Sequence, residues 1–299
     1  YETRLQKQGS HLTNLVLPTP RWDGKADLKG KKLILLWEQG YGDNIQFIRF
    51  ARKLASYDPK KLYVLCPKDI APLFKQLPKI EVIGVDFSSR FDIPAHDYQL
   101  NIPSLPYVLG VNDESQFLCA PYLSAPKANK RLFSGQIQKN KNLRIGLCWA
   151  GSPNHQANNE RSCGLDFFIP LLAYQHISWY SLQKFPDTDE LQILNDSGIA
   201  NIGLACANFA DTAAVISELD LILSVDTAIA HLAGAIGKPV WLLMRYQTEW
   251  RHPRGRTTSP WYPSMRLMRQ AKPGDWDSVL QQVETELESQ YHLTKIEGT

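Results

Sequence analysis

Short apolar runs recur along the second half of the sequence, and each is followed by a stretch with helical periodicity. The runs carry Leu, Ile and Val at consecutive positions, as expected for parallel strands that are covered on both faces. They predict strands at 143–149, 178–183, 199–204, 219–225 and 240–244. The intervening stretches predict helices at about 165–174, 187–196, 211–218 and 228–236. Such alternation is typical of an α/β fold with a parallel sheet.

The first half of the chain alternates in the same way. Its apolar runs predict strands at 33–37, 62–66, 80–85 and 98–102, with helices at 45–54 and 69–77. Residues 121–142 then shift to Pro, Lys, Asn and Ser, which is the composition of a connector. The pattern therefore predicts two Rossmann-like α/β domains that face a central cleft, where open α/β folds bind their ligands.

The connector fixes the predicted domain boundaries. We expect an N-terminal domain at residues 1–130, a C-terminal domain at 131–274 and a separate segment at 275–299. The segment opens with an amphipathic helix at 275–291, which Asp275 caps. Because no strand follows this helix, we expect it to pack back across the first domain.

Composition narrows the class of protein. The 299 residues are 43% hydrophobic, which is enough for two cores, and the formal charge is only +3. We therefore expect no nucleic-acid partner and no anionic membrane surface. Five cysteines without a C-x-x-C pair fit reduced thiols in a cytoplasm. No apolar run reaches the ~18 residues of a membrane span. The chain begins at Tyr1, so we expect a segment upstream of it.

The stretch 219-LDLILSVDTAIAHLAGAIGKPVWLLM-244 predicts a strand, a helix and a second strand. Asp226 or Thr227 is the candidate N-cap, and Gly237 suits the C′ position. A helix that begins at the end of a parallel strand favours a phosphate. Asp226 would repel that anion, so its carboxylate must turn away and leave the N–H groups of Thr227 and Ala228. The alternative is that Asp226 only caps its own helix.

Two further loops follow predicted strands. In 38-EQGYGDNIQF-47, Gly40 and Gly42 allow a tight turn and a close approach to a ligand, while Asp43 is either a simple N-cap or a functional carboxylate. The spacing matches neither G-x-G-x-x-G nor a P-loop.

The other loop is 148-CWAGSPNHQANNERS-162. Gly151 and Ser152 offer donors there, Arg161 offers a phosphate-matching fork, and His155 is a possible acid or base.

The remaining signals are weaker. Asp187-Thr188-Asp189 has the D-x-D form of a metal motif, but it lies where a helix cap is expected, and we favour the cap. No His, Cys, Asp or Glu spacing indicates zinc, and no G-x-S-x-G indicates a nucleophile elbow. We expect His231 to be packed rather than catalytic. The stretch 249–270 is rich in aromatic residues and Arg, and it fits either an ordered loop near the cleft or solvated surface.

Taken together, five stretches resemble a known family. They are LLWEQGYGDNIQFIRF, IGLCWAGSPNH with Arg161-Ser162, WYSLQ, FADTAAVISELDLILSVDTAIAHLAGAIGKPVW and SPWYPSMRLMRQ. The combination resembles the glycosyltransferase domain found behind tetratricopeptide repeats in bacterial proteins, which is similar to the family 9 heptosyltransferases. The resemblance runs from about Trp22 to the C-terminal helix. It implies a GT-B fold, an acceptor-side N-terminal domain, a C-terminal domain that binds the nucleotide sugar, and no metal or other cofactor.

The resemblance also assigns roles to residues. Asp43 matches the aspartate proposed as general base, and Gln39, Gly40 and Gly42 fall in the acceptor-side loop. Donor-binding positions are Gly151, Ser152, Arg161, Gln183, Asp211, Asp226, Thr227 and Ala228. Asp226 to Ala228 would bind the donor diphosphate, with Arg161 beside it, while Gln183 and Asp211 would border the nucleoside. Heptosyltransferases usually have Gly where this chain has Ala228.

These inferences lead to one main hypothesis. The chain is expected to be a cytoplasmic, metal-independent, inverting glycosyltransferase that uses a nucleotide-diphosphate sugar. Its acceptor would be a protein such as flagellin, recruited by helical repeats upstream of Tyr1. The alternatives are a heptosyltransferase-like enzyme of lipopolysaccharide synthesis, a sugar-nucleotide epimerase, and a non-catalytic nucleotide-sugar-binding module.

Overall fold

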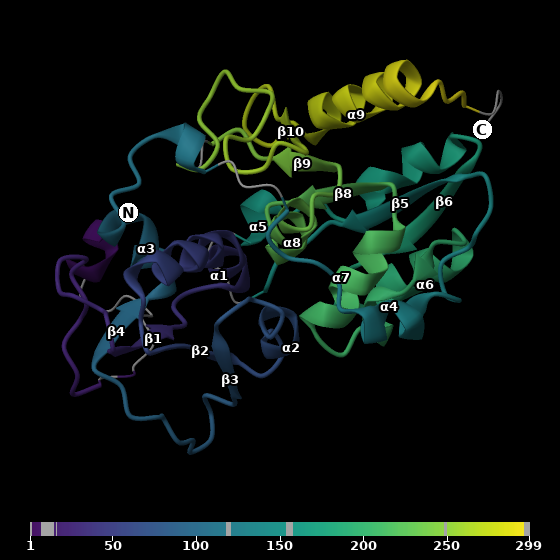
Figure 1. Ribbon diagram of the computed structural model, residues 1–299. Helices are drawn as coiled ribbons and strands as arrows, with labels where there is room; N and C mark the ends of the chain where they lie inside the picture. The colour runs from purple at the N-terminus through teal and green to yellow at the C-terminus, as the bar shows by residue number, and fades with distance from the viewer. Residues whose placement is uncertain are drawn as a thin grey trace.

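The chain folds into two α/β domains, each built on a parallel sheet (Figure 1). The computed structural model describes residues 2–6, 15, 17–117, 121–153, 158–247 and 250–295. The first sheet has the order β3-β2-β1-β4, with β1 (Lys32–Leu36), β2 (Lys61–Pro67), β3 (Glu81–Val85) and β4 (Tyr98–Asn101). The helices of this half are η1 (Glu2–Gln6), α1 (Tyr41–Phe47), η2 (Ile48–Tyr57), α2 (Ala71–Phe74), η3 (Ile102–Ser104), α3 (Leu105–Val108) and η4 (Glu114–Gln116).

The second sheet has six strands in the order β10-β9-β8-β5-β6-β7. They are β5 (Leu143–Cys148), β6 (Ile177–Ser181), β7 (Ala200–Asn201), β8 (Leu221–Val225), β9 (Val240–Met244) and β10 (Met265–Arg269). The helices are α4 (Lys127–Phe133), α5 (Asn158–Arg161), η5 (Asp166–Ala173), α6 (Thr188–Asp196), η6 (Gly203–Ala205), α7 (Phe209–Glu218), α8 (Ala228–Ala235) and α9 (Trp276–Tyr291).

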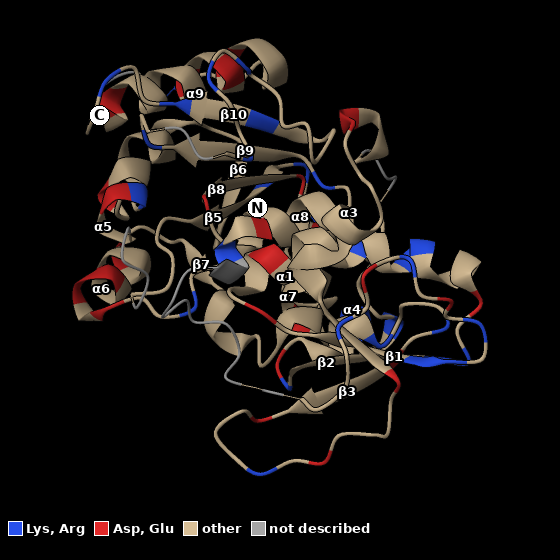
Figure 2. Cartoon of the chain, turned by 90° about the vertical axis from the view of Figure 1, so that its left-hand side faces the viewer, with Lys and Arg blue, Asp and Glu red and all other residues tan. Residues whose placement is uncertain are grey.

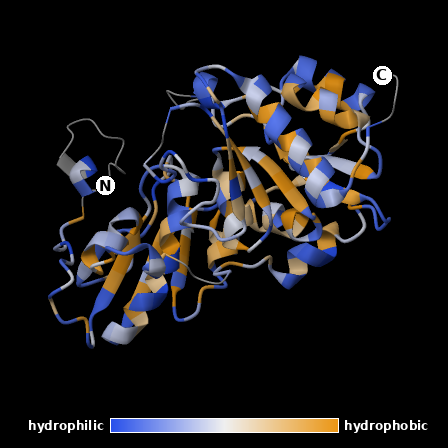
Figure 3. Cartoon of the chain, turned by 90° about the horizontal axis from the view of Figure 1, so that it is seen from above, coloured by the Kyte–Doolittle hydropathy of each residue, from blue (hydrophilic) through white to orange (hydrophobic). Residues whose placement is uncertain are grey.

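The apolar runs form the strands because both faces of each sheet are covered. Every residue of β8 and β9 is buried, and the strands of both sheets are the most hydrophobic elements in Figure 3. The nine predicted strands are confirmed, although β7 keeps only two paired residues. β10 was missed because its sequence, MRLMR, places Arg266 and Arg269 on an edge strand, where they stay partly exposed.

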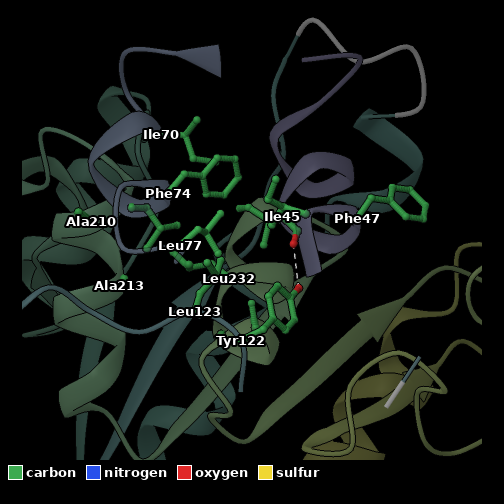
Figure 4. Packing of buried hydrophobic residues seen from close by; sticks show 14 of the residues in the cluster. Ile45, Phe47, Ile70, Phe74, Leu77, Tyr122, Leu123, Ala210, Ala213 and Leu232 are labelled. Atoms are coloured by element: carbon green, nitrogen blue, oxygen red, sulfur yellow. Dashed lines mark hydrogen bonds between the residues drawn. The ribbon is translucent and has the colours of Figure 1, made fainter. Parts of the chain in front are cut away.

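A continuous apolar cluster joins the two domains. Phe74 and Leu77 from the first domain pack near Ala210 and Ala213 of α7 and Leu232 of α8, as Figure 4 shows. Since burial of apolar surface is the main stabilising term, this cluster fixes how the sheets face each other.

The connector contributes to the same core. Tyr122 donates a hydrogen bond to the carbonyl of Ile45 at 2.8 Å, drawn as the dashed line in Figure 4. The predicted boundary at residue 130 falls inside α4, which packs on α7 and buries Phe133. Residues 121–142 are therefore not merely a linker: their composition is polar, but Tyr122, Leu123, Phe133 and Ile137 are buried in the core.

The C-terminal helix corrects one expectation. α9 packs on β10 and η5 of the second domain, and Val279, Val283 and Leu287 join the core of that domain. The prediction that it returns to the first domain is wrong. The unpredicted strand β10 forms the edge of the second sheet, and α9 packs against that strand. Asp275 is its N-cap, as predicted.

The surface of the molecule carries both charges. Figure 2 shows acidic and basic residues interspersed over the two domains, in keeping with the small net charge. Within the residues that the structure describes, no helix has the length and apolar character to cross a membrane.

Candidate functional site

A pocket of about 380 Å³ lies between the domains, at the carboxyl ends of β5, β6 and β8. The chain leaves β5 in one direction to form β6 and β7, then crosses over to form β8 on the other side. Ligands of open α/β sheets bind at this kind of switch point. The pocket is lined by Tyr41, Asp69, Cys148, Ala150, Gly151, Ser152, Pro153, Leu182, Gln183, Lys184, Phe185, Gly203, Cys206, Ala207, Asn208, Phe209, Thr212, Thr227, Ala228 and Ile229.

The N-terminus of α8 opens into this pocket. Thr227, not Asp226, is the N-cap, and its hydroxyl accepts a hydrogen bond from the backbone N–H of Ile229 at 3.3 Å. Gly237 has a φ of +78°, as predicted for the end of this helix. Because the first N–H groups of a helix have no partner within it, Ala228 and its neighbours present donors and positive potential to a ligand.

The Asp226 side chain turns away from the pocket, as the repulsion argument predicts. Its Oδ1 lies 3.7 Å from Nε2 of His231, and Asp226 is absent from the pocket lining. Burial alone would raise the pKa of Asp226, but the hydrogen bond with His231 and the charge of Arg251 hold it below its usual range. Asp226 therefore stays ionised while the helix N-terminus remains open to an anion.

His231 is packed, as predicted, yet it also links the two domains. Its Nδ1 lies 2.9 Å from the hydroxyl of Tyr262, and burial raises the pKa of Tyr262 well above its usual value. The hydroxyl therefore keeps its proton and shares a hydrogen bond with Nδ1, while Nε2 faces Asp226. The ring also rests against Gly42 of α1: a Cβ added at Gly42 would lie 2.7 Å from Cδ2 of His231.

Arg161 lies behind the N-terminus of α8 and is not among the residues that line the pocket. Its Nη1 donates to the carbonyl of Asp226 at 3.1 Å, and a Cβ at Gly151 would come within 2.6 Å of its Cζ. Its Nε is buried without a hydrogen-bond partner among the described residues. Burial lowers the pKa of the Arg161 guanidinium, which marks a desolvated cation that an anionic ligand would stabilise.

The other predicted donor residues divide into two groups. Gly151, Ser152 and Gln183 line the pocket, and Oε1 of Gln183 accepts the N–H of Ala150 at 3.2 Å. Asp211 does not line it. Its carboxylate accepts the N–H of Ala207 at 2.9 Å and completes a capping box with the N-cap Asn208 of α7, so it shapes the wall from behind.

The loop before α1 differs from its predicted form. Gly40 is the N-cap and Asp43 is the third helical residue, so the expectation that Asp43 caps the helix is wrong. The sharp turn is made by Gln39, whose φ is +64°, rather than by a glycine. Gly42 allows close approach, but to His231 across the domain interface. The Asp43 carboxylate therefore makes its contacts outside the helix cap.

Asp43 forms an ion pair with Arg251 of the C-terminal domain, and both side chains are largely buried. Arg251 also donates from Nε to Oε1 of Gln46 at 2.8 Å, and its guanidinium lies 4.5 Å from the ring centroid of Trp250. The stretch that contains Arg251 is thus ordered near the cleft, one of its two predicted forms. The role of Arg251 was missed, because a contact across 208 positions leaves no local pattern.

α1 and α8 lie side by side where the two domains meet, as Figures 1 and 2 both show. Tyr41, two residues before Asp43, lines the pocket and stacks on Phe209 with ring centroids 4.6 Å apart. The backbone N–H of Phe209 donates to the carbonyl of Asp69 at 3.0 Å. Tyr41 of α1 and the N-terminus of α8 therefore line the same pocket, whereas Asp43 is not among its lining residues.

The described part of the chain contains no group of three or more His, Cys, Asp or Glu side chains arranged to hold a metal ion. Asp187 is the N-cap of α6 in a capping box with Glu190, so the cap interpretation of 187–189 is confirmed. His155 lies outside the described residues. Cys148 is a free thiol beside Thr227, and burial raises its pKa, so it is unsuited to act as a thiolate.

Known proteins are similar to this chain in sequence and in fold. Residues 191–277 match the sequence profile of Glycosyltransferase family 9 (heptosyltransferase). The chain is 26% identical over 309 residues to Protein FlbA of Caulobacter vibrioides, an alignment that covers 96% of this chain and 51% of FlbA. The chain thus spans about half the length of that relative.

Solved glycosyltransferases have a similar fold. A family 9 glycosyl transferase from Veillonella parvula has a TM-score of 0.66 at 13% identity, covering 89% of this chain and 98% of its own. The ADP-heptose LPS heptosyltransferase II of E. coli has a TM-score of 0.55 at 13% identity, and the match covers 87% of this chain and 99% of that enzyme. TibC of enterotoxigenic E. coli, an iron-containing dodecameric glycosyltransferase, has a TM-score of 0.52 at 14% identity, and the match covers 89% of this chain and 78% of TibC.

At these identities the likeness shows the fold alone, an α/β fold with parallel sheets that matches GT-B heptosyltransferases. Residues 191–277 are thus similar in sequence to glycosyltransferase family 9, and the fold of the chain is similar to that of heptosyltransferases.

Proposed function

We propose that this chain is a glycosyltransferase that moves a sugar from a nucleoside-diphosphate donor to an acceptor hydroxyl with inversion at the anomeric carbon. The observation that carries the proposal is the packing of α1 of one domain against α8 of the other beside the pocket. The open N-terminus of α8, with the Arg161 guanidinium behind it, would provide an anion site, and Asp43 of α1, which does not line the pocket itself, would act on the acceptor from beside it.

The pocket suits the donor. Its volume of about 380 Å³ lies within the usual range of about 300–1,000 Å³ for small-molecule sites. The diphosphate would accept hydrogen bonds from the N–H groups at Thr227 and Ala228, with Arg161 behind them. This positive end would stabilise the charge that develops on the leaving group, so the proposal includes no metal.

Asp43 would act as general base. As the acceptor oxygen forms its bond to the anomeric carbon, its proton passes to Asp43, and the carbon–oxygen bond to the diphosphate breaks with the electron pair leaving on the phosphate. Arg251 pairs with the Asp43 carboxylate and would hold it in a fixed direction beside the cleft. Attack from the side opposite the leaving group gives inversion.

The acceptor is the finer part of the proposal. We propose a protein acceptor, such as flagellin, brought to the cleft by tetratricopeptide repeats upstream of this chain. The support is the sequence resemblance, together with the alignment to only half of FlbA. A lipopolysaccharide-type heptosyltransferase is the second candidate, favoured by the likeness to the E. coli enzyme named for ADP-heptose.

A panel of ADP, GDP, UDP, CDP and dTDP tests the donor site by thermal shift. A nucleotide at one hundred times its Kd should stabilise the fold by about 2.7 kcal/mol. If no member of the panel shifts the melting temperature, the pocket is not a nucleotide site.

Turnover tests the base. Asp43→Asn removes the proton acceptor but keeps the shape, so release of the nucleoside diphosphate in the presence of acceptor should fall by roughly 10²–10⁴-fold at unchanged donor affinity. Asp277→Asn, in the first turn of α9 and remote from the cleft, is the matched control. A wild-type chain that binds a nucleotide sugar but never releases its diphosphate would favour the non-catalytic binding module.

A further inference from the structure

Glu38 is a fully buried carboxylate in the loop that leads to Asp43. It lies two residues after the end of β1 and has a relative exposure of 0%. An ionised carboxylate taken out of water is strongly destabilising unless it is paired and hydrogen-bonded. The identity of its partner therefore decides how this loop is held.

The partner is Arg4, from the segment that precedes the first sheet. Arg4 Nε donates to Oε1 of Glu38 at 2.6 Å, and Nη2 donates to Oε2 at 2.7 Å. Nη2 also donates to the hydroxyl of Ser104 at 2.7 Å. Two parallel bonds between a guanidinium and a carboxylate form the most directional ion pair available to a protein. Arg4 itself is only 7% exposed.

The place of this pair in the sheet is informative. Glu38 follows β1 and Ser104 follows β4. From β1 the chain adds β2 and β3 on one side of the sheet and then β4 on the other, so the strand order reverses between β1 and β4. The carboxyl ends of β1 and β4 therefore form the crevice in which an open α/β sheet normally takes a ligand. In this protein the guanidinium of Arg4 fills that crevice.

The pair is connected to Asp43 through Asn44. Asn44 Nδ2 donates to the carbonyls of Glu38 at 2.6 Å and Gly40 at 2.8 Å. Between them, Gln39 holds a left-handed backbone, which a non-glycine residue adopts only when its surroundings impose it. The loop is thus fixed on one side by Asn44 of α1 and on the other by Arg4.

We propose that Arg4 is a positioning residue for the general base: by neutralising Glu38 it fixes the turn that starts α1 and so sets the position of Asp43 beside the cleft. This inference rests on the proposed function. It assigns a role in the reaction to a segment that lies outside both sheets and ahead of the part of the sequence that carries the family resemblance.

The test compares Arg4→Met, Glu38→Gln and the double variant Arg4→Met/Glu38→Gln. Arg4→Met leaves a buried charge without a partner, so the turn should shift and turnover should fall by about 10²-fold, as for a misplacement of about 1 Å. The dissociation constant for the nucleoside diphosphate chosen by the panel should stay within twofold. The double variant, which buries no charge, should recover at least tenfold of the lost turnover.

The matched control is Arg21→Met. Arg21 pairs with Glu2 of the same segment but is 41% exposed, so its loss should leave turnover unchanged. A purely structural role for Arg4 would lower the melting temperature and weaken donor binding and turnover together, and the double variant would recover none of the turnover. That result would overturn the proposal, as would an Arg4→Met variant with wild-type turnover.

Amide hydrogen exchange provides a measurement that needs no activity. In Arg4→Met, exchange should rise in residues 38–47 and return toward wild type in the double variant, while the pocket walls on the second domain stay protected. Unchanged exchange at 38–47 would refute the positioning role. If the wild type has no transferase activity but exchange responds as expected, the proposed function fails while the control of this loop by Arg4 stands.

Discussion

Gly42→Ala is the sharpest test of how the two domains align the site. Gly42 lies inside α1, where alanine is by itself more favourable than glycine by about 1 kcal/mol. The new Cβ, however, would lie 2.7 Å from Cδ2 and 3.3 Å from Nε2 of His231. Carbon atoms pack best at about 3.5–4.0 Å, so α1 and α8 must separate by about 0.8 Å or the imidazole must rotate.

Neither adjustment is free of consequence. Rotation would break the 2.9 Å hydrogen bond between His231 and Tyr262, both of which are buried. Separation would carry Asp43 away from the donor loop by nearly 1 Å, and a misplacement of that size can lower turnover by about 10²-fold. Overpacking should cost about 1–3 kcal/mol of stability, partly offset by the helical preference of alanine.

The assay measures turnover, donor affinity and urea unfolding on one preparation of each variant. Gly135→Ala is the control, because a Cβ there meets nothing within 4 Å. The decisive comparison uses His231→Ala as background: with the imidazole gone, Gly42→Ala should change turnover by less than threefold. An equal loss in both backgrounds would show that the contact with His231 is not the cause.

Three other predictions follow from single contacts. Arg161→Ala should weaken nucleoside-diphosphate binding by about 1.5–3 kcal/mol in calorimetry, and Gly151→Ala should act in the same direction because its Cβ displaces the guanidinium. Asp226 has a depressed folded pKa, so its contribution to stability is present above the unfolded value of about 3.9 and is lost at lower pH. Asp226→Asn should therefore destabilise the fold in urea at pH 7 and progressively less below about pH 4. Phe133→Ala should lower the free energy of unfolding by about 3–5 kcal/mol, since α4 belongs to the core, and a loss under 1 kcal/mol would return it to a surface role.

The sequence predicted the fold where each local pattern had one physical explanation. Strands such as β8 and β9 are buried along their whole length because both faces of the sheet are covered. A surface helix would instead have polar residues on its exposed face. β10 was missed because two of its five residues are arginines that make other contacts. Arg266, for example, pairs with Glu286 of α9 at 2.6 Å, so its charge belongs to the strand rather than to a loop.

The sequence predicted those residues of the candidate site that directly follow a strand. Thr227, Gly151 and Gln183 follow buried strands of one parallel sheet, so they had to meet at one edge. Arg251 and Arg4 had no comparable signal. Each acts through a partner more than thirty positions away, and the buried state of that partner cannot be read from a single sequence.

In the proposed mechanism, the alignment of base and donor would depend on the interface rather than on either domain alone. Asp43 belongs to the first domain and the N-terminus of α8 to the second, so no contact within one sheet can set their separation. The separation is set by Gly42, which lets α1 approach α8, and by the stacking of Tyr41 on Phe209. Because a packed interface of this kind resists small displacements, a substitution there should change the proposed turnover before it changes the fold of either domain. The contact between α1 and α8 is therefore where the proposed mechanism is most sensitive to substitution.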